Sequence, residues 1–123
     1  DNFQAQELIS YIQNNSAPED AVLMWGAETA YNYAARRRSP TRFVYQYPLY
    51  RADYANKENV TAFLNDLIED KPRLIIMASS ESLSDFRFGF RDYQIGGLME
   101  HLKGFYVQSG QVGDWVIYTY NGQ

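Results

Sequence analysis

Two glutamates follow apolar segments of this chain, and as a pair they could act as a general acid and a general base. Glu28 comes shortly after the apolar segment 21–25, and Glu81 comes shortly after the apolar segment 74–78. Acid–base catalysis needs both carboxyl groups within hydrogen-bonding reach of one substrate. The alternative interpretation is structural, because the positive end of a helix dipole stabilises a glutamate in the first turn. The sequence leaves both interpretations open.

Three consecutive arginines, Arg36, Arg37 and Arg38, form the best local candidate for an anion site in a chain whose formal net charge is −4. Arg42 follows closely. Guanidinium groups bind phosphate and carboxylate through paired hydrogen bonds, so this cluster could hold a phosphate. The alternative is that the arginines end a short helix over residues 28–35, where cations stabilise the negative end of the helix dipole.

Ser79 and Ser80 could supply a nucleophile, but the strained Gly-x-Ser-x-Gly turn of serine hydrolases is missing around them. Serines after a strand also cap loops through their hydroxyl groups. His101 is the one histidine, and because no partner is suggestively spaced we interpret it as a structural or surface residue. The chain has no cysteine and no carboxylate cage, so the sequence predicts no metal site and no cofactor.

A classical dinucleotide-binding site and a nucleic-acid partner are not expected from the sequence. The segment 25–28 reads Trp-Gly-Ala-Glu, with one glycine in place of the three of a dinucleotide-binding fingerprint, and there is no P-loop. Glu28 would also place a negative charge where a phosphate should bind. The net charge of −4 disfavours a nucleic-acid partner, because such partners are attracted by basic surfaces.

Length and composition indicate one folded domain. The chain has 123 residues, of which 46% are hydrophobic, and this is enough to bury a core without disulfides. No segment reaches the roughly 18 apolar residues that a membrane helix needs. The sequence does not begin with Met and enters a helical pattern almost at once. Such a start is typical of a domain cut from a longer protein, although a processed terminus would look the same. We therefore expect residues 1–123 to be a single α/β domain.

The hydrophobic pattern predicts alternating helices and strands. Apolar residues recur at helical spacing near the start of the chain, again over residues 60–68, and again over residues 95–102. Short apolar or aromatic runs predict five strands, at residues 21–25, 42–47, 74–78, 105–108 and 114–120. A turn over residues 109–113 joins the last two strands as an antiparallel hairpin.

This order predicts an α/β fold: a three-layer Rossmann-like sandwich with a mostly parallel sheet and a C-terminal antiparallel hairpin. A strand order beginning 2-1-3 places the first strand in the middle. The fifth strand could lie at the edge or between the third and the fourth. In open sheets of this kind ligands bind beyond the carboxyl ends of strands, at the switch point between the first and third strands.

That crevice and the neighbouring arginines give the set of candidate ligand-binding residues. No catalytic residue is predicted. The candidates are Trp25, Gly26, Glu28, Arg36, Arg37, Arg38, Ser79, Ser80 and Glu81.

A family resemblance rests on three stretches of the sequence. Residues 17–28 read Ala-Pro-Glu-Asp-Ala-Val-Leu-Met-Trp-Gly-Ala-Glu, and residues 36–49 read Arg-Arg-Arg-Ser-Pro-Thr-Arg-Phe-Val-Tyr-Gln-Tyr-Pro-Leu. Residues 71–76 read Lys-Pro-Arg-Leu-Ile-Ile. This succession resembles the soluble C-terminal region of bacterial polytopic membrane glycosyltransferases of the GT-C class, the dolichyl-phosphate-mannose type related to family 39. The resemblance spans about residues 3–78.

The resemblance implies an extracytoplasmic domain attached to a bacterial membrane enzyme that uses a lipid-linked sugar. Its partners would be the membrane helices of the parent protein, and a lipid-linked sugar or an acceptor. In that class the catalytic aspartate lies in an early loop near the N-terminal membrane helices, so no catalytic residue is carried over to this chain. The resemblance therefore implies a noncatalytic accessory domain, which acts as a lid, an acceptor-binding module or a scaffold.

Two other functions remain open from the residues alone. The first is a small stand-alone α/β enzyme, or a binder of nucleotides or sugar phosphates, that uses the crevice near Trp25 and Glu28. The second is a protein-interaction module that uses the aromatic segment 86–93. Tyrosine and phenylalanine are abundant here, and such side chains serve in cores and in contact surfaces alike.

Overall fold

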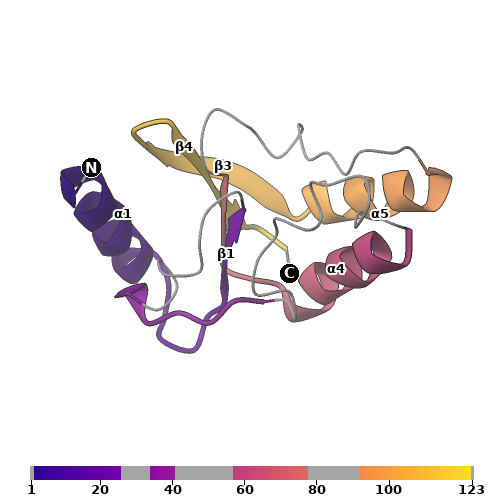
Figure 1. Cartoon of the computed structure of the whole chain (residues 1–123), viewed down its shortest axis with the longest axis horizontal. Helices are drawn as coiled ribbons and strands as arrows, with labels where there is room; N and C mark the ends of the chain where they lie inside the picture. Colours follow the sequence, from indigo (N-terminus) through magenta and orange to yellow (C-terminus); the bar gives the residue numbers. More distant parts are fainter. Residues whose placement is uncertain (1, 26–33, 41–56, 78–91, 123) are drawn as a thin grey trace.

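The computed structural model describes residues 2–25, 34–40, 57–77 and 92–122. Helices and strands alternate along these ranges and give an α/β fold (Figure 1). The helices and strands in chain order are α1 (Asn2–Asn14), β1 (Val22–Trp25), α4 (Lys57–Asp70), β2 (Leu74–Met77), α5 (Tyr93–Lys103), β3 (Tyr106–Val112) and β4 (Trp115–Tyr120). None of the helices in these ranges has the length and apolar character needed to cross a membrane.

The described strands form one mixed sheet in the order β1-β2-β4-β3. β1 and β2 correspond to the first and third predicted strands. They pair in parallel, so the prediction that these two strands are neighbours is confirmed. β4 pairs antiparallel with β2 on one side and with β3 on the other. The last strand is therefore inserted into the sheet, which resolves the alternative left open by the sequence. Since two of these three pairings are antiparallel, the prediction of a mostly parallel sheet is wrong for the described strands.

The predicted second strand, residues 42–47, lies outside the described residues. Its predicted place beside the first strand in a Rossmann-like order therefore stays a prediction. The predicted helix over 28–35 is described at residues 34 and 35 alone, and both are helical. Each strand that the structure does describe overlaps a predicted one. The apolar runs at 22–25 and 74–77 are buried at every position, as a strand covered on both faces must be.

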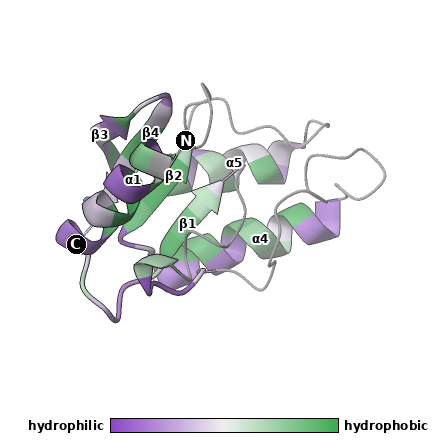
Figure 2. Ribbon diagram, turned by 60° about the vertical axis from the view of Figure 1, so that its left-hand side comes forward, coloured by the Kyte–Doolittle hydropathy of each residue, from purple (hydrophilic) through white to green (hydrophobic). Residues whose placement is uncertain are grey.

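Helices cover both faces of the sheet, so the three-layer prediction is confirmed. Side chains alternate across a strand, and Leu23 and Trp25 point to one face while Val22 and Met24 point to the other. The first face packs on α4 and α5, and the second packs on α1. Figure 2 shows β1 and β2 as strongly apolar strands, and the helices beside them carry both apolar and polar residues. The core therefore consists of two clusters separated by the sheet.

The C-terminal hairpin is longer than its sequence suggests. β3 continues to Val112, and the turn consists of Gly113 and Asp114, so the predicted turn over residues 109–113 is wrong. Gly113 has φ 58°, a left-handed conformation that glycine adopts without strain. The polar run Gln-Ser-Gly-Gln in β3 shows no hydrophobic alternation, so a hydrophobicity pattern does not predict a strand there. The run is polar because β3 lies at the exposed edge of the sheet, and it contains a bulge between Gln108 and Gly110.

α1 protects that edge strand. The amide of Gln4 donates a hydrogen bond to the backbone oxygen of Val112 over 3.4 Å, and the hydroxyl of Tyr11 donates to the backbone oxygen of Ser109 over 3.4 Å. An edge strand otherwise lies open to pairing with another strand. Two side chains of one helix thus tie the start of the chain to its last hairpin.

α5 begins at an acidic cap. The carboxylate of Asp92 accepts hydrogen bonds from the backbone N–H of Gln94 at 2.9 Å and of Ile95 at 3.2 Å. Chiefly through the bond from Ile95, the pKa of Asp92 lies below its usual value. The stabilisation that this cap provides is therefore present above the ordinary aspartate pKa and is lost as the pH falls through the lowered one.

Candidate functional site

Trp25, the first residue of the predicted crevice, belongs to the core. It ends β1, its exposed fraction is 0%, and its ring lies 5.2 Å from that of Phe63 on α4. The large apolar surface of tryptophan favours such burial. In this arrangement the indole holds β1 against α4.

Arg37 is buried and joins the ends of two helical segments. Its Nε donates to Ser16 Oγ at 2.9 Å, and its Nη2 donates to the backbone oxygens of Ser16 at 3.1 Å and Gln13 at 3.5 Å. Its Nη1 donates to the backbone oxygens of Arg36 at 3.2 Å and Ala35 at 3.3 Å. The last carbonyls of a helix have no partner within it and carry negative partial charge. The guanidinium therefore caps the C-terminal ends of both segments.

The other two arginines project from the same turn. Arg36 has φ 59°, the left-handed conformation in which helices commonly end. Arg38 makes an ion pair with Asp70 at the end of α4, with Nη1 and Oδ1 2.9 Å apart. Its backbone oxygen accepts a hydrogen bond from the N–H of Val22 at 3.0 Å. The three arginines thus do not converge on one point, and Arg37 follows the helix-end interpretation.

The remaining candidate ligand-binding residues lie outside the described residues. They are Gly26, Glu28, Ser79, Ser80 and Glu81. The pairing of Glu28 with Glu81, and the crevice itself, stay predictions. Of the aromatic residues in the segment 86–93, Tyr93 lies among the described residues, and its exposed fraction is 97%. Within the described ranges, no group of three or more histidine, aspartate or glutamate side chains could hold a metal ion.

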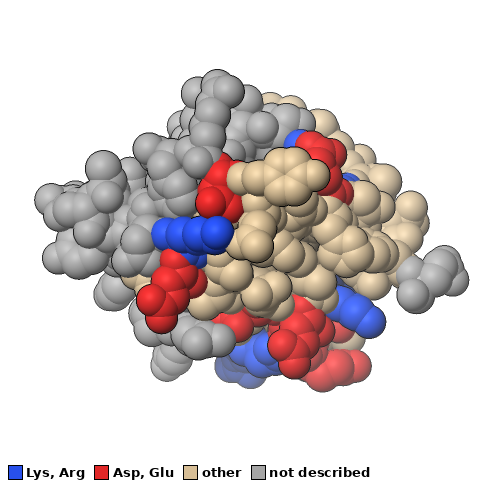
Figure 3. Space-filling view, turned by 90° about the vertical axis from the view of Figure 1, so that its right-hand side faces the viewer, with Lys and Arg blue, Asp and Glu red and all other residues tan. Residues whose placement is uncertain are grey.

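Charges on the described surface are mixed in sign. Figure 3 shows lysine and arginine side chains next to aspartate and glutamate over α4 and α5. Lys57 pairs with Asp92 at 3.4 Å, and Lys103 pairs with Glu100 at 3.1 Å. Neighbouring charges of opposite sign cancel within a short distance in salt water. This face therefore presents no extended field of one sign.

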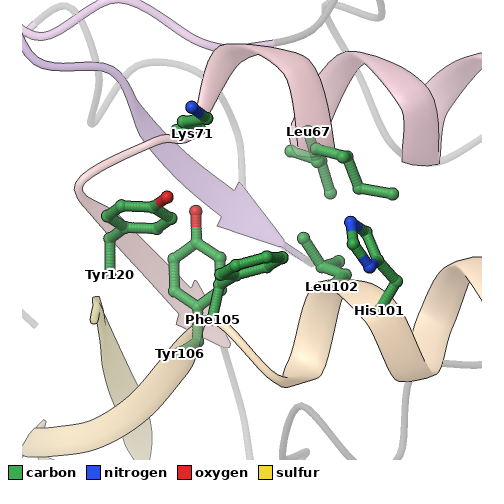
Figure 4. A pocket seen from close by; sticks show the side chains of 8 residues that line it. Leu67, Lys71, His101, Leu102, Phe105, Tyr106 and Tyr120 are labelled. Carbon is green, nitrogen blue, oxygen red and sulfur yellow. The ribbon is translucent and has the colours of Figure 1, made fainter. Parts of the chain in front are cut away.

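A pocket of about 140 Å³ lies where α4, α5 and β4 end and β3 begins (Figure 4). The last turn of α4 and the last turn of α5 form two of its sides, and the start of β3 and the end of β4 complete it. Its lining residues are Leu67, Ile68, Lys71, His101, Leu102, Phe105, Tyr106 and Tyr120. The hairpin places Tyr106 opposite Tyr120, so the two rings meet there from adjacent strands.

The sequence does not predict this pocket, because its residues come from the ends of four separate elements. Of its lining, the sequence drew attention to His101 alone, as a structural or surface residue, and the structure leaves its side chain exposed. The signal that could have found the pocket is the aromatic pair Phe105 and Tyr106 directly after a helix end. Because α5 and β3 meet at a short turn, both side chains can line one pocket there.

Tyr106 lines the pocket and is 7% exposed. Its hydroxyl donates a hydrogen bond to the backbone oxygen of Pro72 at 2.7 Å, which links β3 to the start of β2. Burial, with smaller contributions from Tyr120 and Asp70, raises the pKa of the Tyr106 phenol above its ordinary value of 10.0. The phenol therefore remains a hydrogen-bond donor throughout the physiological range.

Replacing Tyr106 by phenylalanine is expected to lower the free energy of unfolding by about 1–2 kcal/mol, because the carbonyl of Pro72 loses its donor. The raised pKa also makes the wild-type protein less stable as the pH rises above about 10, since the unfolded state then releases a proton that the folded state keeps. Urea unfolding at about pH 8 and about pH 11 measures both effects. A Tyr106→Phe variant with an unchanged alkaline loss would contradict this assignment.

Comparisons with known proteins give one structural likeness. No protein-family model matches the sequence, and no curated protein matches it. The fold is similar to the C-terminal globular domain of an oligosaccharyltransferase from Archaeoglobus fulgidus, with a TM-score of 0.49 and 11% sequence identity. The match covers 95% of this chain and 96% of that chain. At this identity the likeness concerns the path of the chain, and no residue role is transferred from it.

Proposed function

We propose that this chain is a noncatalytic accessory domain of a bacterial membrane glycosyltransferase. The proposal starts from the resemblance of residues 17–28, 36–49 and 71–76 to the C-terminal region of such enzymes. The observation that carries it further is the use of Arg37, the buried member of the arginine cluster. Its hydrogen bonds go to Ser16 and to backbone oxygens of the domain, which supports an architectural role for the cluster rather than a phosphate site.

In this proposal the domain lies on the extracytoplasmic face and is attached to membrane helices of its parent protein. Trp25 and Arg37 then make the domain rigid. Trp25 joins the sheet to α4, and Arg37 joins α1 to the helical segment that ends at Ala35. A rigid domain of this kind suits a lid or a scaffold that contacts the acceptor or the lipid-linked sugar. The chemistry itself would belong to the membrane part.

The test compares the complete parent enzyme with the isolated chain of residues 1–123. The gene upstream of Asp1 is expected to encode several membrane spans. The isolated chain is expected to transfer no sugar from a lipid-linked donor, whereas the complete enzyme does so. An open reading frame without upstream membrane spans, or sugar transfer by the isolated chain, would overturn the proposal.

A thermal-shift experiment separates this proposal from a stand-alone nucleotide or sugar-phosphate binder. The isolated chain is heated with nucleotides and with sugar phosphates, and the Glu28→Ala variant serves as the control. The accessory-domain proposal expects no rise in Tm with either class of compound. A rise that disappears in Glu28→Ala would assign the ligand to the predicted crevice and replace the proposal, because a ligand stabilises the state that binds it.

A further inference from the structure

The pocket between the ends of α4 and α5 has the size of a single ring. Its volume is about 140 Å³. An apolar cavity of roughly 150 Å³ in an unrelated protein accepts one benzene molecule. Pockets for larger ligands run from roughly 300 Å³ upward. A six-membered ring is therefore the largest group that this pocket can enclose.

Aromatic rings form one wall of the pocket. The rings of Phe105 and Tyr120 lie 6.0 Å apart with an interplanar angle of 23°, and Tyr106 meets Tyr120 edge to face at 5.5 Å. In Figure 4 these three rings lie in a row, with His101 beyond Phe105 and with Leu67 and Lys71 across from them. Aromatic faces carry partial negative charge and favour contact with weakly positive C–H groups. Such a wall suits a ring that presents C–H bonds on its face.

The charges around the pocket are of opposite sign, so they select neither anions nor cations. α4 and α5 both end at the pocket, and the C-terminal ends of helices repel anions. Lys71 follows the end of α4 in a left-handed conformation, with φ 54°, and its positive charge opposes that of the helix ends. An uncharged ligand depends on neither effect.

Polar atoms are nevertheless available at the rim. The lysine ammonium donates hydrogen bonds, and the imidazole of His101 and the phenol of Tyr120 can donate and accept them. A hydrocarbon ring would make no hydrogen bonds with these groups. A ring that carries hydroxyl groups at its periphery and C–H bonds on its face satisfies both the aromatic wall and the polar rim.

We propose that this pocket binds one uncharged pyranose ring, stacked on Phe105 and Tyr120 and hydrogen-bonded at its periphery by Lys71 and His101. The inference rests on the volume, the aromatic wall and the charges of the pocket, and it does not depend on the proposed parent enzyme. A domain with another parent would still bind the sugar. Conversely, a failure to bind sugar would leave the accessory role untouched.

The experiment titrates the isotope-labelled chain with methyl glucoside, methyl mannoside and methyl galactoside, and follows the backbone amide signals by NMR. Because the pocket buries a single ring, affinities in the millimolar range are expected. The largest signal changes are expected around Lys71, His101 and Tyr120, and small changes over α1. Cyclohexanol and toluene, which lack most or all of the hydroxyl groups, are titrated in parallel.

Two variants test the assignment without removing the aromatic wall. Ile68 is half-buried at the pocket, so Ile68→Trp is expected to fill the space and abolish binding. His101→Ala is expected to weaken binding about tenfold, because it removes a hydrogen-bonding group and an edge contact to Phe105. Glu100→Ala, next to His101 on the same helix but outside the pocket lining, is expected to bind like the wild type.

Circular dichroism and thermal unfolding of each variant confirm that it folds. Three results would overturn the proposal: no signal change with any glycoside, tighter binding of toluene than of every glycoside, or unchanged binding in a folded Ile68→Trp variant. Signal changes in the wild type that are lost in Ile68→Trp and kept in Glu100→Ala would support it. If Ile68→Trp does not fold, the other two variants decide. Weaker binding in His101→Ala than in Glu100→Ala would support the proposal, and equal binding in the two variants would overturn it.

Discussion

Replacing Arg37 by methionine is expected to lower the free energy of unfolding by about 3 kcal/mol, because several buried or partly buried carbonyls lose a charged donor at once. Methionine keeps much of the side-chain volume, so the loss reports the hydrogen bonds rather than a cavity. Arg37→Lys is expected to recover little of the stability, since an ammonium group cannot reach both helix ends as a planar guanidinium does. Urea unfolding followed by circular dichroism measures these differences.

The neighbouring residue provides a matched control for this experiment. Arg36 is exposed and has φ 59°, so Arg36→Gly removes an arginine while relieving a left-handed conformation. Its stability is expected to equal or exceed that of the wild type. An Arg37→Met variant as stable as Arg36→Gly would show that the guanidinium does not hold the two helix ends, and the phosphate-site interpretation would return.

Replacing Trp25 by alanine is expected to cost about 3–5 kcal/mol, the range typical of large aromatic residues in a core. The side chain is fully buried against Phe63, and its removal would leave a cavity between β1 and α4. Trp25→Phe is expected to cost less, because most of the apolar contact is kept. Thermal and urea unfolding measure both losses.

Phe3 is the control for the Trp25 experiment. It is an aromatic residue with an exposed fraction of 78%, so Phe3→Ala is expected to change stability by about 0.5 kcal/mol or less. If Trp25→Ala left the stability equally unchanged, the tryptophan would not be a core residue. It would then regain its predicted place in a ligand crevice.

The buried strands and the amphipathic helices could be predicted from the sequence, because their patterns are local. The runs at 22–25 and 74–77 are continuous and apolar, and the stripe that contains Val60, Phe63, Leu64 and Leu67 repeats at helical spacing. β3 shows the limit of this reasoning. Its polar edge residues carry no alternation, so the pattern ended the strand four residues before Val112, where the structure ends it.

The order of the strands could not be predicted from the sequence. Tertiary packing determines that β4 lies between β2 and β3. The amino-acid composition of β4 is compatible with an edge strand and with a central strand. The same reason hid the pocket, which forms where α4, α5, β3 and β4 end near one another. For Arg37, the helix-end interpretation was available from the sequence, but its burial and its contacts with Ser16 and Gln13 required the fold.

The insertion of β4 between β2 and β3 has a consequence for the way in which the domain is made. A ribosome releases β1, β2 and β3 before β4, yet β3 pairs with β4 alone among the described strands. The two parts of the sheet therefore stay separate during translation until residues 115–120 have left the exit tunnel. Pairing of β4 with β2 also joins residues far apart in sequence, which slows folding. A premature stop before Trp115 would thus split the sheet at its centre instead of trimming its edge.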